Sequence, residues 1–137
     1  MLALDTLRAA IESVWAAERT DIPTRTADSR LHADRLRYWA ELWVLPTDGV
    51  ARRDAAPDRI AIEVIVHLFV QPSASGTTAE TLLDRARRTL ERRCIAADGC
   101  RIRLREAGVR DLSPARDDGM ADRHLVLIVP GEATEAP

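Results

Sequence analysis

Hydrophobic positions near the N-terminus repeat with the spacing of an amphipathic helix. They lie at i, i+3, i+7, i+10 and i+11 and share one helical face; these are Leu4, Leu7, Ile11, Val14 and Trp15. The pattern ends at Pro23, because the residue before a proline avoids the helical region. The spacing therefore predicts a helix over about residues 3–19, followed by a long polar connection over residues 23–36.

Alternating and β-branched positions in the middle of the chain predict two strands. Residues Tyr38–Leu45 are rich in strand formers and place Trp39 and Trp43 on one face. Residues Ile60–Val70 are largely apolar on both faces, which is typical of a central strand covered on both sides. A polar link with a turn signal, Asp48-Gly49, separates the two strands.

The second half of the chain predicts one further helix. Thr77 followed by Glu80 is a capping-box pattern ahead of an apolar-periodic run, and it indicates a helix over about residues 78–95. The face of this helix opposite the apolar positions carries Arg85, Arg88 and Arg92. Two more strands are expected after the helix.

The first of these strands covers residues Arg101–Leu112 and places Arg101, Arg103 and Arg105 on one wet face. The last strand covers Arg123–Val129, and Pro130-Gly131 is expected to end it. The remaining residues, 132–137, are interpreted as a flexible C-terminal tail.

The order helix, strand, strand, helix, strand, strand predicts an α+β domain over residues 1–131. We expect a mostly antiparallel sheet of about four strands flanked by two helices. A chain of 137 residues fits a single domain and can bury a core without disulfides or a structural metal.

Charge and cysteine content exclude several classes of protein. The formal net charge is −2, whereas a duplex-DNA binder of this size would show a basic excess. No apolar run approaches the roughly 20 residues of a membrane span, and the first residues do not form a signal peptide, so synthesis in the cytoplasm is expected. Cys94 and Cys100 match no zinc or redox motif and are interpreted as reduced thiols.

Tests for chemistry all give negative results at the level of motifs. There is no phosphate-binding glycine pattern and no G-x-S-x-G context for a serine nucleophile. His67 is interpreted as a packed, hydrogen-bonded residue rather than a ligand. Asp117 and Asp118 could form a metal or acid–base pair, but two carboxylates in a glycine-containing loop are usually a solvated turn. We therefore expect no catalytic, cofactor or metal site, and no enzyme.

The remaining candidates are contact residues. Trp39 and Trp43 either pack in the core or lie in a subunit interface, where aromatic residues are enriched. The stripe of Arg101, Arg103 and Arg105 either pairs with carboxylates of its own sheet or contacts a neighbouring protein or passing DNA. Charged faces and an acidic loop could give complementary contacts between subunits; the residues are Arg85, Arg88, Arg92, Asp117 and Asp118.

Three stretches of the chain together carry a family resemblance. They are residues 7–19, beginning Leu7-Arg8-Ala9-Ala10-Ile11-Glu12, residues 58–66, beginning Asp58-Arg59-Ile60, and residues 116–127, beginning Arg116-Asp117-Asp118-Gly119. In this order the chain resembles the tail-terminator proteins of lambda-like long-tailed phages and prophages. The resemblance covers about residues 4–130, with no correspondence over residues 24–58.

The resemblance implies an α+β subunit of a hexameric ring, located at the head-proximal end of the virion tail and assembled in the cytoplasm of a bacterial host. Such a ring would cap the last ring of major tail tube protein and meet the head-side connector, and DNA would pass through its lumen without sequence-specific binding. Three alternatives remain open: another head–tail connector or neck protein (head-completion or stopper), a small-ligand-binding α+β module, and a DNA-binding regulator.

Overall fold

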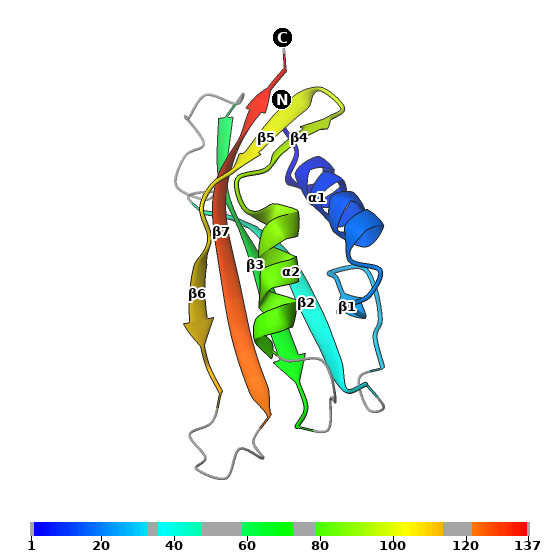
Figure 1. Cartoon of the computed structure of the whole chain (residues 1–137). Coiled ribbons are helices and arrows are strands. Elements are labelled where there is room, and N and C mark those ends of the chain that lie inside the picture. The colour runs from blue at the N-terminus through cyan, green and yellow to red at the C-terminus, as the bar shows by residue number, and fades with distance from the viewer. Residues whose placement is uncertain (1, 33–35, 48–58, 73–78, 114–121, 137) are drawn as a thin grey trace.

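The chain folds into one curved sheet with two helices on one of its faces (Figure 1). The computed structural model describes residues 2–32, 36–47, 59–72, 79–113 and 122–136. In chain order, the elements within these residues are α1 (Leu4–Glu18), β1 (Thr24–Arg25), β2 (Tyr38–Pro46), β3 (Arg59–Val70), α2 (Ala79–Leu90), β4 (Cys94–Ala97), β5 (Cys100–Leu104), β6 (Gly108–Asp111) and β7 (Arg123–Glu135).

Strand β7 organises the sheet. The strand order is β1-β2-β3-β7-β5-β4, and β6 also pairs with β7. One edge of β7 pairs with β3 along nearly its whole length, while the other edge pairs with β6 near its start and with β5 near its end. Only β1 and β2 run parallel; the other neighbouring strands among the described residues are antiparallel. The sheet curls into a half-barrel.

The hydrophobic core lies between the inner face of the sheet and the helices. Leu7, Ile11 and Trp15 form the buried face of α1, with the spacing that the sequence predicts. They pack with Leu82 and Leu90 of α2 and with the inner positions of the strands in one cluster. Burying a leucine or isoleucine side chain contributes about 1.5–3 kcal/mol. The two helices therefore shield this face of the sheet from solvent.

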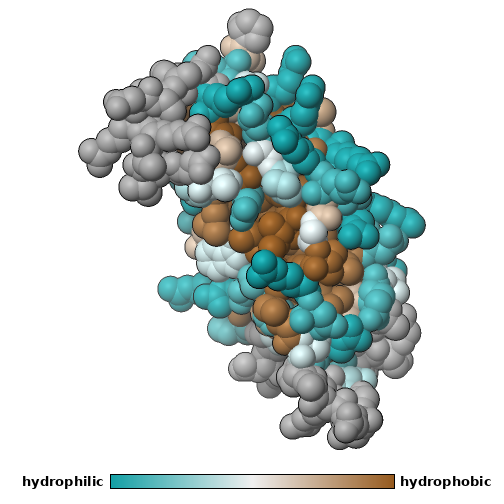
Figure 2. Space-filling view, turned by 90° about the vertical axis from the view of Figure 1, so that its left-hand side faces the viewer, coloured by the Kyte–Doolittle hydropathy of each residue, from teal (hydrophilic) through white to brown (hydrophobic). Residues whose placement is uncertain are grey.

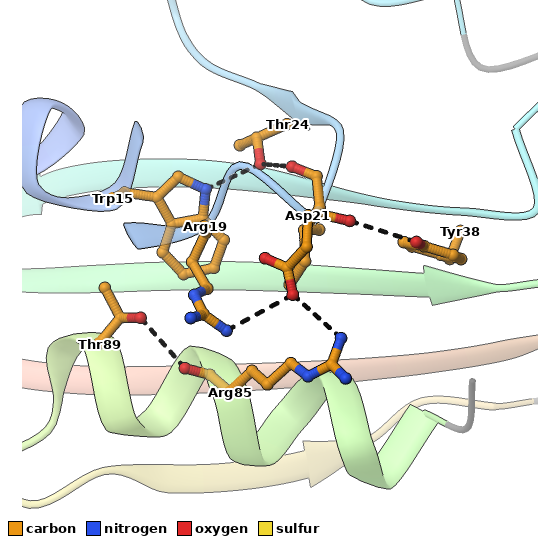
Figure 3. Close-up of polar contacts among 8 residues, drawn as sticks. Trp15, Arg19, Asp21, Thr24, Tyr38, Arg85 and Thr89 are labelled. Carbon is orange, nitrogen blue, oxygen red and sulfur yellow. Dashed lines mark hydrogen bonds and ion pairs between the residues drawn. The ribbon is translucent and has the colours of Figure 1, made fainter. Parts of the chain in front are cut away.

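Polar contacts fasten the end of α1 to the edge of the sheet (Figure 3). The Trp15 indole N–H donates to Thr24 Oγ1 at 2.8 Å, and that hydroxyl donates to the Ile22 carbonyl at 2.8 Å. The Tyr38 hydroxyl donates to the Asp21 carbonyl at 3.2 Å. These bonds satisfy an otherwise buried indole N–H and fix the short strand β1 beside β2.

The expectation of a four-stranded sheet flanked by two helices is wrong. The sheet has seven strands within the described residues, it is mixed because β1 pairs parallel with β2, and both helices pack on the same face. Strand β1 lies in the connection over residues 23–36, for which a short strand was an open alternative, and β4 was not predicted. The single strand expected over Arg101–Leu112 is two strands, β5 and β6, which pair with different parts of β7.

The second helix ends earlier than its apolar periodicity indicates. It stops at Leu90 instead of about residue 95, because Arg92 adopts a positive φ of 56°. A residue in this left-handed conformation commonly ends a helix, and it is usually a glycine. Because the residue here is an arginine, the sequence does not predict the end of the helix. The chain turns there, and Cys94, expected on the apolar face of the helix, begins β4 with an exposed side chain.

The last strand continues past Pro130-Gly131, where the sequence analysis ended it. It extends to Glu135, and its residues up to Glu135 pair with β5, so residues 132–135 are not a flexible tail. The Pro130 carbonyl accepts a bond from the Arg105 N–H, on the side of β7 where β6 gives way to β5. The missing N–H of Pro130 points to that same side, so the proline does not interrupt the pairing with β3.

Candidate interaction surface

The face of the sheet that points away from the helices is the main candidate surface. We call it the outer face. Alternate residues of β2, β3 and β7 point to it. Its half-buried members include Trp39, Glu41, Trp43, Ala61, Glu63, Ile65, His67, Phe69, His124 and Ile128. No helix within the described residues covers this face. Trp39 and Trp43 therefore lie outside the helix-covered core, on the surface side of the sheet.

Apolar residues gather on the side of the molecule where β6 lies. Figure 2 shows them in the middle of that side, with hydrophilic residues around them. Among the described residues, the exposed large hydrophobic side chains are Leu45, Val109 and Leu112, at 44 %, 40 % and 53 % exposure. Leu45 lies in β2, at one lateral edge of the sheet, and the other two lie in or just after β6, at another edge. None of these three residues is among the contact residues that the sequence predicts.

An aromatic row crosses three strands on the outer face. Trp39 stacks on Phe69 with ring centroids 5.0 Å apart, and Phe69 stacks on His124 at 4.4 Å. Both sides of the Phe69 ring are therefore covered by neighbouring rings. A binder of single-stranded nucleic acid would present ring faces on which bases stack. In this row the Phe69 ring therefore has no free face on which a base could stack.

Two histidines, which the sequence analysis placed in separate elements, meet in the outer face. His67 Nδ1 lies 2.8 Å from His124 Nε2, so one ring donates a hydrogen bond and the other accepts it. Burial and then the nearby His67 lower the pKa of His124, against the opposing effect of Glu41 and Asp111. No group of three or more histidine, cysteine or carboxylate side chains gathers as a metal site within the part of the chain that the structure describes.

The arginine stripe lies on the same outer face, at the opposite end of the sheet. Arg101 of β5 lies opposite Thr134 of β7, and Thr134 lies opposite Arg59 of β3. Because Arg59 and Ile65 are on the same face of β3, Arg101 is on the outer face as well. Arg101, Arg103 and Arg105 are exposed, and none forms an ion pair with another described residue. The structure therefore brings the tryptophans and this stripe onto one face, which the sequence pattern did not reveal.

The arginines of α2 have a different role. The Arg85 guanidinium lies 3.0 Å from Asp21, which also pairs with Arg19 at 3.7 Å (Figure 3). Arg88 pairs with Asp84 of its own helix, whereas Arg92 lies beyond the end of α2 and pairs with Glu106 in the connection before β6. Exposed ion pairs contribute only about 0–1 kcal/mol each. These arginines form contacts within the chain, on the helix side rather than on the outer face.

Asp117 and Asp118, the acidic residues predicted to take part in contacts, lie outside the described residues. The same holds for the capping residue Thr77 and the turn Asp48-Gly49. Both cysteines are free: Cys94 is exposed and Cys100 is buried. Burial raises the pKa of the Cys100 thiol, which favours its neutral form.

The outer face carries two open hollows within the described residues. The wider one, of about 540 Å³, is lined by Glu63, Ile128, Pro130 and residues 106–110. A pocket of about 240 Å³ lies at the end of the aromatic row and is lined by Trp39, Phe69, Leu112, Arg123, His124 and neighbouring residues. Ligand pockets usually measure roughly 300–1,000 Å³ and enclose most of their ligand. The hollow at the aromatic row is smaller than this range, and the wider hollow is within it but is broadly open to solvent. Trp43 and His67, which lie on the same face, do not line the smaller hollow. The geometry is that of a contact surface rather than an enclosed binding site.

Comparisons with known proteins bear on the fold only. No protein-family model and no curated protein matches the chain, whereas four solved chains are similar in structure. One of them, known only by a sequence identifier, superposes with a TM-score of 0.75 and covers 100% of this chain and 99% of its own, at 16% identity. Likeness at this identity shows a common fold and nothing about activity. Among the described helices, none is long and apolar enough to cross a membrane.

Proposed function

We propose that this protein is a structural subunit of a long-tailed phage or prophage tail, a tail terminator that closes the tail tube as a ring. The observation that carries the proposal is the outer face, which no described helix covers. It has an aromatic row at one end and, at the other, a stripe of arginines without ion-pair partners among the described residues. Aromatic residues and arginine are the side chains most enriched at the centres of protein interfaces. A surface of this composition fits a permanent contact with another protein.

The partners follow from this role. Copies of the chain form the ring, the major tail tube protein lies on one side of it, and the head-side connector lies on the other. DNA passes through the lumen without sequence-specific binding, in keeping with a net charge of −2. The protein is made in the bacterial cytoplasm and resides at the head-proximal end of the virion tail. It uses no cofactor and performs no catalysis.

The proposal assigns the outer face to contacts with adjoining tail proteins. Ile65 is a suitable probe because it lies in the middle of this face, between Trp43 of β2 and Ile128 of β7 in register. Ile65→Glu adds a charge to a half-buried apolar site, which is costly when a partner covers it. Ile65→Val preserves the apolar character and is the matched control.

The test is a tube-capping assay. The tail tube protein of a long-tailed phage is polymerised with and without this protein, and tube ends and lengths are measured by negative-stain electron microscopy. We expect capped ends and arrested growth with the wild type and with Ile65→Val, and loss of capping with Ile65→Glu. Binding to the connector without binding to tubes would favour a neck protein instead, and binding to neither would contradict the proposal.

A further inference from the structure

Four arginines form one line along the side of β7 where β5 and β6 pair with it. On the outer face, the residues opposite Thr134, Glu132, Pro130, Ile128 and Val126 of β7 are, in that order, Arg101, Arg103, Arg105, Gly108 and Arg110. The arginines are exposed, and none forms an ion pair with another described residue. We call these four residues the arginine row. It extends the arginine stripe by Arg110 and is interrupted at Gly108.

The arginine row has a regular spacing. Alternate residues of a strand lie about 6.4–6.8 Å apart, which sets the distance between successive arginines of β5. Arg110 lies about twice as far from Arg105, because the β7 residues opposite them are four positions apart. A partner in an extended conformation repeats its side chains with the same period. Carboxylates at alternate positions of such a partner therefore face the arginines, and an uncharged residue faces Gly108.

The interruption of the row coincides with the wider hollow of the outer face. Gly108, Ile128, Pro130 and Arg110 are among the residues that line this hollow of about 540 Å³. A Cβ on Gly108 would meet no atom within 4 Å, so the space beside this residue is open. Ile128 and Pro130 give the hollow an apolar part, in which an apolar side chain of a partner is removed from water.

The hollow is part of the fold, because β5 and β6 are joined by one extra residue. Glu106 and Ala107 together lie opposite the single residue Val129 of β7, in the manner of a β-bulge. The end of α2 holds this connection in place. The Ala107 N–H donates to a Glu91 carboxylate oxygen at 2.8 Å, and the Arg92 guanidinium lies 3.1 Å from Glu106.

Carboxylates beside the row favour a protein partner over nucleic acid. Glu132 of β7 is already paired with Arg59 at 3.1 Å, and Glu63 lies on β3, across β7 from the row. A phosphate backbone laid on this part of the outer face would be repelled by Glu63, whereas a protein can place carboxylates over the row and uncharged groups over Glu63. The net charge of −2 also gives no long-range attraction to nucleic acid.

We propose that the arginine row and the wider hollow bind an extended acidic segment of another protein, in which carboxylates at alternate positions flank one apolar residue. The apolar side chain enters the hollow at Gly108. The carboxylates two positions before and after it pair with Arg105 and Arg110, and a further carboxylate pairs with Arg103. Arginine can hold a carboxylate through two parallel hydrogen bonds, which adds geometric specificity. The inference rests on the proposed function, which assigns the outer face to contacts with tail proteins, and it names the chemistry of the partner segment.

A peptide with this pattern is the probe. The nine-residue peptide Glu-Ser-Glu-Ser-Leu-Ser-Glu-Ser-Glu, blocked at both ends, has the same pattern in both directions, so the direction of binding does not affect the test. The control peptide Ser-Glu-Ser-Glu-Leu-Glu-Ser-Glu-Ser has the same composition and charge. In an extended conformation, its carboxylates lie on the face opposite the leucine. Binding of each peptide to the full chain is measured by isothermal titration calorimetry at low salt, because salt screens exposed charges.

Two variants test the row and the hollow separately. Arg105→Gln combined with Arg110→Gln removes two charges of the row, and its control, Arg30→Gln combined with Arg88→Gln, removes two exposed charges elsewhere. Gly108→Leu fills the hollow, whereas Gly108→Ala leaves most of it open. The thermal midpoint of each variant, measured by circular dichroism, checks the fold.

We expect the first peptide to bind wild type at least about three times more tightly than the control peptide. Its binding should weaken about three- to tenfold in the row variant and in Gly108→Leu, and remain unchanged in the two control variants. Equal binding of the two peptides, or wild-type binding by both the row variant and Gly108→Leu, would overturn the inference.

Two further measurements separate this inference from its alternatives. A short duplex DNA that binds more tightly than the first peptide, with the same dependence on Arg105 and Arg110, would overturn the inference in favour of nucleic acid. Tube capping by wild type alongside a failed peptide test would overturn the inference and leave the proposed function. A preference for the first peptide without tube capping would remove the role in the tail and support the site.

Discussion

Gly131 lies where two strands approach too closely for any side chain. It belongs to β7 and is paired with Leu104 of β5. A Cβ at this position would lie 2.7 Å from Leu104 Cδ2 and 2.8 Å from the Arg103 carbonyl oxygen. Carbon contacts are ordinarily about 3.5–4.0 Å, so Gly131→Ala is short of space by roughly 0.7–1 Å.

Neither contact can be relieved without loss. The Arg103 carbonyl is part of the β5 backbone, and moving it would pull β5 away from β7. The Leu104 side chain is 2 % exposed, so it has little room to rotate. Overpacking of this kind costs about 1–3 kcal/mol. With a urea dependence of about 1–3 kcal/mol per molar, a loss of about 2 kcal/mol lowers the unfolding midpoint by roughly 0.7–2 M.

Urea unfolding followed by circular dichroism measures the effect of Gly131→Ala. The matched control is Gly108→Ala, because a Cβ at Gly108 meets nothing within 4 Å and its φ is not positive. The control is expected to change the free energy of unfolding by less than about 1 kcal/mol in either direction. A Gly131→Ala variant as stable as the wild type would refute the close approach of β5 to β7.

Three further predictions concern polar groups. Trp15→Phe leaves the Thr24 hydroxyl without its indole donor and should cost about 1–3 kcal/mol, measured by urea unfolding; no change would mean that the bond does not form. Asp21→Asn removes the partly exposed pair with Arg85 and should cost less than about 1 kcal/mol, an effect that added salt reduces; a larger, salt-independent loss would contradict this account. Because the pKa of His124 is lowered below 6.5, the unfolded chain binds more protons, so the unfolding free energy should rise with pH up to about that value. His124→Gln should flatten this rise, and an unchanged slope would contradict the assignment.

The parts of the fold that the sequence predicts are those with long, regular periodicity. The helix over Leu4–Glu18 and the strand over Arg59–Val70 match their expected positions closely, because each buries an unbroken run of alternating or helical apolar positions. Helix and strand existence depends on such local patterns. The number of strands does not depend on local patterns, because it is set by which segments pair with one another in the folded chain.

The misread segments share a physical cause. The left-handed Arg92 ends α2 without a glycine signal, so the strand at Cys94 was assigned to a helix. The sequence predicts that Pro130 and Gly131 end a strand, whereas both lie within β7. Pro130 lies where β6 gives way to β5 along β7, and Gly131 leaves space for the close approach of β5. Only the tertiary arrangement shows that a missing N–H and a missing side chain are needed there.

The candidate surface was predictable only in part. The tryptophan pair and the arginine stripe were identified from alternation, but alternation within one strand cannot show that two distant strands share a face. The meeting of His67 with His124 depends on the pairing of β3 with β7, to which the sequence pattern gives no register.

The most direct test of self-assembly is the mass and shape of the purified protein. Native mass spectrometry together with class averages from electron microscopy would give the number of subunits and their arrangement. This account predicts a closed ring with a central opening, in which neighbouring copies are related by rotation alone. A single 15.2 kDa species at concentrations well above those in an infected cell would contradict it.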